Sequence, residues 1–132
     1  MNAASYDVAT GIIAADSALA LTYGTDLFTK KMPDTPPACV CVYDTGGDGD
    51  ELQYVYERPH IQVKIRGAKG GYDDAYATAH AIKRLVHGTA NTTINGTRYV
   101  VIAVLGDVMS IGDDDNNRPL LTVNFTIHRT DA

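Results

Sequence analysis

The sequence predicts an α+β fold, a mixed or antiparallel β-sheet with two helices packed on one face, plus a β-hairpin arm. Apolar and polar residues alternate without a break over residues 61–66 and again over 121–128, as in strands that have one buried face. Two other segments carry apolar residues at helical spacing. These patterns together indicate a sheet with a core face under helices and a displayed polar face.

The N-terminal part predicts one helix and one strand. Residues 7–23 are expected to be helical and to end at Gly24, because apolar residues recur on one stripe: Val8, Ile12, Ala15, Leu19 and Tyr23. A proline-containing linker follows, since proline does not continue a helix. Residues 38–43 are apolar on both faces, which predicts a central or helix-covered strand.

The middle of the chain predicts a turn, two strands and the second helix. Residues 44–50 are acidic and rich in glycine, which favours a mobile turn, and residues 52–56 are expected to form a short return strand before 61–66. A helix over 73–86 is predicted from a second stripe, with Gly88 as its C-terminal stop: Tyr72, Ala75, Ala79, Ile82 and Val86.

The C-terminal part predicts a hairpin and a last strand. Asn95-Gly96 is a strong signal for a two-residue turn, here between residues 92–94 and 97–105. Residues 106–117 read as a second acidic loop, and the last strand follows Pro119. The expected order is α-β-β-β-α-β-β-β within a single domain over residues 1–132.

Composition narrows the classes of function. The net charge of −5 argues against a nucleic-acid-binding protein, because such proteins usually carry a basic excess. Cys39 and Cys41 lie two residues apart on one predicted strand, where a disulfide between them would be strained, so both are expected to be buried thiols. The apolar run 12–21 is broken by Asp16 and too short for a bilayer. We therefore expect no export signal and no membrane anchor.

Two acidic segments are the candidates for chemistry. Residues 113–117 resemble the opening of a calcium-binding loop, but Arg118 and Asn124 stand where such a loop needs glycine and glutamate. A metal-dependent nuclease would need carboxylates held on rigid elements, and the 44–50 turn is rich in glycine. We predict no catalytic residue, no metal and no cofactor.

Several segments together carry a resemblance to a known family. These are residues 37–47, residues 58–67, a helix bearing Tyr72 and Tyr76, residues 112–118, and the strand ending at Arg129. Over roughly residues 8–129 the chain resembles the bacteriophage minor capsid family that contains the tail terminator proteins of long-tailed phages. The shared motifs are structural, so the resemblance implies a non-enzymatic virion protein.

The resemblance implies a role in assembly. Tail terminators form a six-fold ring on the last ring of tail-tube protein, stop tube growth and create the surface that joins the head–tail connector. The implied partners are other copies of the chain in a hexamer, the tube protein and the connector or neck protein. Genomic DNA would pass through the acidic lumen without sequence-specific binding. The implied location is the tail end of the virion, with assembly in the host cytoplasm.

Three groups of residues are the candidate interfaces. The 44–50 turn and the 106–118 loop are expected to reach neighbouring rings or subunits, and the polar strand face is expected to meet a neighbour or line the channel. Arg66 and Arg118 are the expected ion-pair anchors, since an arginine fork binds carboxylates in fixed geometry. The full set is Asp44, Gly46, Gly47, Asp48, Asp50, Gln62, Lys64, Arg66, Asp107, Asp113, Asp115, Arg118, Asn124 and His128.

Two alternatives stay open. The chain could be a neck or head-completion protein of the same virion, which gene order or a labelled position in the particle would separate from a terminator. It could instead be a small metal-dependent enzyme that uses the acidic loops. Metal-dependent activity that is lost on Asp113→Ala or Asp115→Ala would favour the enzyme.

Overall fold

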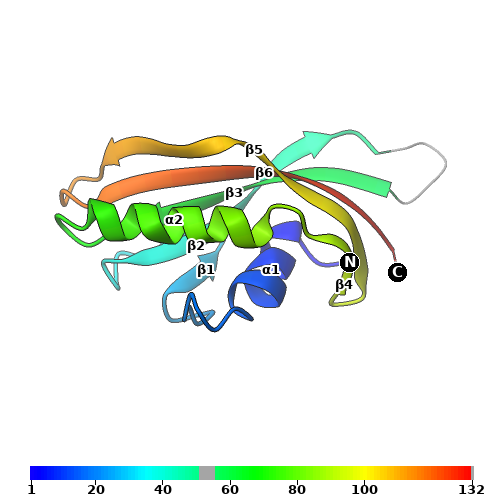
Figure 1. Ribbon diagram of the computed structural model, residues 1–132, viewed down its shortest axis with the longest axis horizontal. Helices are drawn as coiled ribbons and strands as arrows, with labels where there is room; N and C mark the ends of the chain where they lie inside the picture. The colour runs from blue at the N-terminus through cyan, green and yellow to red at the C-terminus, as the bar shows by residue number, and fades with distance from the viewer. Residues whose placement is uncertain (51–55, 132) are drawn as a thin grey trace.

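The computed structural model describes residues 1–50 and 56–131, and within them one six-stranded sheet carries the helices on a single face (Figure 1). The strand order is β1-β2-β3-β6-β5-β4. The strands are β1 Leu27–Thr29, β2 Cys39–Asp48, β3 Tyr56–Arg66, β4 Ala90–Ile94, β5 Thr97–Asp113 and β6 Pro119–Asp131. The helical segments are α1 Ala4–Val8, the π-helical turn η1 Ala9–Ile13, and α2 Tyr72–Val86.

The sheet is mixed, as the sequence predicted. Strand β1 runs parallel to β2, and every other pair of neighbours is antiparallel. The α+β fold with helices on one face is therefore confirmed. The two-residue hairpin between β4 and β5 is confirmed as well, since Ile94 pairs with Thr97 and both Asn95 and Gly96 have positive φ, as a type I′ turn requires.

The core lies between the helices and alternate residues of the central strands. Val42, Val63 and Val123 face one another across β2, β3 and β6, and all three are fully buried. Helix α2 covers this face with small and branched side chains, as predicted: Ala75, Ala79, Ile82 and Val86. Tyr72 is the exception to the predicted stripe, because it is 44% exposed.

The N-terminal helix is much shorter than the predicted 7–23. Regular helix ends at Val8 and one π turn follows to Ile13. The wider turn adds one residue to the repeat, so Ile13 is buried where the α-helical stripe had placed Ile12. Gly11 lies directly against Ile94, so a larger residue there would collide with the β4 side chain.

Both predicted acidic loops are largely strand, and this corrects the sequence interpretation. Residues 44–48 extend β2, and residues 106–113 extend β5. The glycines in these segments accompany shifts in strand register between Asp44 and Gly47 and between Leu105 and Met109; a glycine within a strand often marks such a bulge. Strand β1 was missed inside the predicted linker, and the predicted return strand at 52–56 lies, except for Tyr56, outside the described residues.

Candidate interaction surfaces

The face of the sheet opposite the helices displays four of the predicted interface residues. Gln62 lies beside Asn124 in register, and its Nε2 donates to Asn124 Oδ1 at 3.2 Å. Lys64 lies beside Thr122 on the same face, and His128 Nδ1 is 3.0 Å from Tyr56 Oη. Gln62, Lys64, Asn124 and His128 are all partly exposed. The structure therefore brings these four together; their contact with a neighbour stays a prediction.

Arg66 was expected on this displayed face but is only 5% exposed. Its Nε donates to the carbonyl of Pro37 at 2.7 Å, and its Nη2 donates to the carbonyls of Pro33 and Pro36 at 2.7 and 2.8 Å. The guanidinium thus holds the crossover 30–38 that joins the parallel strands β1 and β2. Arg66 thus connects the end of β3 to three backbone carbonyls of the crossover through charge-assisted hydrogen bonds.

The crossover explains why both cysteines are buried. Cys39 and Cys41 lie on the side of β2 away from the helices, yet they are 3% and 0% exposed, and both are free thiols, as predicted. The crossover lies on that side, where Arg66 binds its carbonyls. Burial raises the pKa of each thiol, so neither has the thiolate character of a reactive cysteine.

Arg118, the other expected anchor, binds the same crossover from the turn that precedes β6. Its Nη1 donates to the carbonyl of Asp34 at 2.8 Å, and its Nη2 lies 2.8 Å from Asp34 Oδ1. Its Nε donates to Asp114 Oδ2 at 2.7 Å. Burial alone would raise the pKa of Asp114, but hydrogen bonds from the backbone and side chain of Arg118 outweigh it and lower this pKa. Arg118 is therefore engaged within its own chain.

The last residues of β2, beyond Asp44, form one end of the molecule (Figure 1). Asp44 accepts hydrogen bonds from the backbone and hydroxyl of Ser5. The carboxylate of Asp48 lies 4.0 Å from His60 Nε2. A Cβ on Gly47 would meet the backbone of β3, while Gly46 has open space around it. Asp50 is exposed beyond the strand.

The distal half of β5 and the turn to β6 form the opposite end (Figure 1). Asp107 Oδ1 is 2.7 Å from Lys83 Nζ on α2, and this hydrogen bond lowers the pKa of Asp107. Asp113 and Asp115 are exposed. The two acidic segments thus lie at opposite ends of the sheet, and no group of three or more metal-binding side chains gathers at either end within the described residues.

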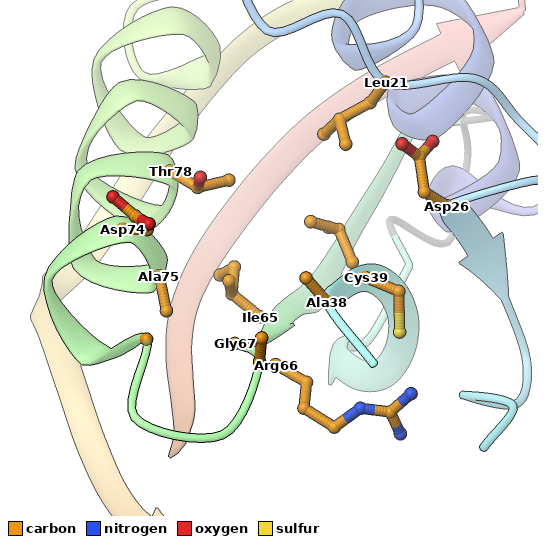
Figure 2. Close-up of a pocket in the computed structure, with 13 residues that line it drawn as sticks. Leu21, Asp26, Ala38, Cys39, Ile65, Arg66, Gly67, Asp74, Ala75 and Thr78 are labelled. Atoms are coloured by element: carbon orange, nitrogen blue, oxygen red, sulfur yellow. The ribbon is translucent and has the colours of Figure 1, made fainter. Parts of the chain in front are cut away.

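A cavity of about 200 Å³ opens between the N-terminal end of α2 and the adjoining ends of β2 and β3. Figure 2 shows Asp26 and Asp74 on opposite sides of it and the Arg66 guanidinium directed away from its centre. Its remaining walls are mainly apolar, including Leu21, Ile65 and Ala75. Its described lining contains two carboxylates, Asp26 and Asp74, and no histidine.

A buried polar cluster beneath the sheet was missed by sequence reasoning. Asp7 is fully buried and accepts hydrogen bonds from Tyr99 Oη at 2.6 Å and from Asn95 Nδ2 at 2.9 Å. Arg129 donates to the same tyrosine oxygen at 3.2 Å and binds Glu57 through Nε and Nη2. One feature of the sequence could have indicated this cluster. Arg129 stands at a position where the alternation along β6 places a core residue, and a buried charged side chain needs partners.

No helix among the described residues is long and apolar enough to cross a membrane.

The chain is similar to known proteins in fold and in sequence. The chain resembles a chain from the structure described as "Virion of native gene transfer agent (GTA) particle", with a TM-score of 0.68 at 15% sequence identity. The match covers 92% of this chain and 96% of that chain, so the two share a fold over nearly their whole length. No curated protein sequence matches the chain.

The model of one family matches residues 16–131, and its description is "Bacteriophage tail terminator protein". This match spans most of the chain and defines the class, a structural protein of a phage-like virion. The chain belongs to the bacteriophage tail terminator family. The resemblance stated from the sequence is thereby confirmed.

Proposed function

We propose that this chain caps the tail tube as a closed ring, stops tube polymerisation and forms the surface to which the head–tail connector binds. Membership of the tail terminator family over residues 16–131 is the observation that carries the proposal. The ring is proposed to be a hexamer, at the tail end of the virion, assembled in the host cytoplasm. Capping is a binding function and requires no bond chemistry.

The shape of the subunit supports this role. The acidic ends of β2 and β5 lie at opposite ends of one long sheet (Figure 1), so a ring of such subunits would carry acidic residues on both rims. A ring in which each subunit uses two different patches closes by rotation. Asp113 and Asp115 are exposed on one rim, where we propose contact with the tube or the connector.

The polar sheet face and the net charge suit a channel for DNA. The face carries Gln62, Lys64, Asn124 and His128, and the chain has an overall charge of −5. A lumen within an acidic ring would repel the phosphate backbone rather than bind it. We propose that DNA passes without sequence-specific contact.

The test is to add the purified chain to growing tail tubes and to image them by electron microscopy. We expect rings at the tube end that is distal to the tip, and arrested growth. Binding to DNA-filled heads but not to tubes would instead assign the chain to the neck, and binding to neither would contradict a structural role at this joint. Asp115→Lys should weaken rim contact, whereas Asp131→Lys, also an exposed charge reversal, is the matched control.

A further inference from the structure

Besides the outer edges of the short terminal strands β1 and β4, two stretches of sheet edge pair with no other strand among the described residues. Strand β1 pairs with β2 only from Val40 to Val42, which leaves the outer edge of residues 43–48 open. Strand β4 pairs with β5 only as far as Val101, and residues 87–89 then bind the edge at Ile102 and Val104. The outer edge of β5 is open from Leu105 onward. Open edges expose backbone donors and acceptors that pair readily with another strand.

The open edge of β5 is also apolar. Leu105, Met109 and Ile111 are 43%, 52% and 47% exposed, within a stretch of seven residues. Natural sheets usually protect an exposed edge with charges or by making it short, and strand β4 fits that pattern because it is short and polar. Apolar side chains along an open strand edge indicate that this edge is covered in the assembled state.

The charges beside the two edges are complementary. A hollow of about 490 Å³ beside Val104 and Gly106 is lined by His80, Lys83 and Arg84 of α2 and by His87, which follows the helix. Arg84 is exposed, and no carboxylate pairs with it among the described residues. The open edge of β2 ends at Asp48, which is exposed and whose one ion pair among the described residues is with His60, at 4.0 Å. Lys83 is already paired with Asp107, so Arg84 is the cation of this hollow that matches the acidic end of β2 in charge.

Strand direction makes the two edges fit each other in a ring. Strands β2, β3, β6 and β5 are successively antiparallel, so β2 and β5 run in opposite directions. Copies related by rotation about an axis inclined to the strands keep the same face inward, and β2 of one copy would then lie antiparallel to β5 of the next. In that arrangement Asp48 lies beside Leu105, next to the hollow that holds Arg84.

The parts of the two edges that β1 and β4 cover determine how far neighbouring copies must be displaced along the strands. Strands β1 and β4 block opposite ends of the two edges, so neighbouring copies must be displaced along the strands before the open segments can meet. A constant displacement of this kind is what a sheet needs in order to close into a barrel.

We propose that the β2 edge over residues 43–48 of one copy adds antiparallel to the β5 edge over residues 105–111 of the next copy, with Asp48 facing Arg84. The occupant of the β5 edge is thus a second copy of this chain. This inference rests on the ring proposed above and names the contact that closes it. A two-fold β5–β5 pairing is the competing arrangement, and it would leave Arg84 without an acidic partner.

Cysteine cross-linking tests the contact. Met109→Cys and Thr45→Cys chains are oxidised separately and as a first mixture, both as purified protein and in assembled particles. A second mixture, in which exposed Thr92→Cys replaces Thr45→Cys, is the control. We expect disulfide-linked dimers in the first mixture only, and a ladder of larger species from the double variant. Dimers from Met109→Cys alone would overturn the proposal in favour of the two-fold pairing. The absence of cross-links in both preparations would also overturn it.

Charge exchange gives an independent readout. Arg84→Glu and Asp48→Arg should each weaken association between copies about tenfold, and the double variant should recover most of it. Arg98→Glu, an exposed charge reversal on the part of β5 that β4 already pairs, should leave association unchanged. Equal losses in the single and double variants would contradict the contact. If rings cap tubes but the cross-link does not form, this inference is wrong and the proposed function stands. If cross-linked oligomers form but do not bind tubes, the inference stands and the proposed function is wrong.

Discussion

Tyr99 Oη donates a 2.6 Å hydrogen bond to Oδ2 of Asp7, and both side chains are fully buried. The two residues are 92 positions apart in the sequence. Their bond ties α1 to β5, and Arg129 extends the link to β3 through Glu57. A buried polar cluster with its groups satisfied favours one arrangement of these elements over others.

We expect Tyr99→Phe to lower the free energy of unfolding by about 1–3 kcal/mol, because it removes a donor to the buried Asp7 carboxyl and an acceptor for Arg129. Urea unfolding followed by circular dichroism measures the change. Tyr6→Phe is the matched control, since Tyr6 is exposed and should change stability little. Equal stability of Tyr99→Phe and the parent chain would contradict the role assigned to this cluster.

Alkaline pH should destabilise the fold. Burial raises the pKa of Tyr99 and that of Tyr43, the latter to about 12. In the unfolded chain both phenols titrate near 10, so above that pH the folded state retains protons that the unfolded state releases. The free energy of unfolding should therefore fall between about pH 10 and about pH 12. Urea titrations across this range measure it, and a Tyr43→Phe variant should show a shallower fall; identical slopes would count against the assignment.

Arg66→Lys should expose the two cysteines. A lysine cannot reproduce the three carbonyl contacts made from two nitrogens of the guanidinium, so the crossover 30–38 would open more often. We expect the reaction of Cys39 and Cys41 with a thiol reagent to speed up about tenfold, while Arg98→Lys on the surface leaves it unchanged. A rate equal to that of the parent chain would show that the crossover is held by other contacts.

Gly47→Ala should distort the β2–β3 hairpin. The added Cβ would meet Pro59 Cα at 2.7 Å and His60 N at 2.9 Å, both backbone atoms, at a φ of +135°. We expect a loss of about 1–3 kcal/mol, together with weaker association between copies. Gly46→Ala separates strain from collision, because it adds a side chain at positive φ into open space. If both variants lost the same stability, the contact with β3 would not be the cause.

The parts of the fold that follow a regular repeat could be predicted from the sequence. The alternation along β3 and β6, the small residues of α2 and the Asn95-Gly96 turn each depend on local geometry. The bulged strand ends near Gly46 and Gly106 could not, because glycine and aspartate favour turns and strand bulges alike. Strand β1 has only three residues and is defined by pairing with β2 rather than by a pattern of its own.

The interaction surfaces were predicted less completely, for a related reason. Gln62 and Asn124 could be placed on one face because the two strands alternate in phase. Arg66 and Arg118 could not be assigned correctly, since an arginine at a strand end looks the same in sequence whether it faces solvent or a carbonyl of the same chain. Their partners Pro33, Pro36 and Asp34 lie in a segment without periodicity, which only the folded crossover brings near.

The place of β6 in the sheet has a consequence during synthesis of the protein. Strand β6 follows all the other strands in the sequence, yet it lies between β3 and β5. A nascent chain that has not reached Pro119 therefore has two separate pieces of sheet and no middle strand to join them. Folding must wait for translation of the last thirteen-residue strand, because contacts between distant parts of a chain form late. A truncated product would lack the joined sheet, so it could not enter a ring as a faulty subunit.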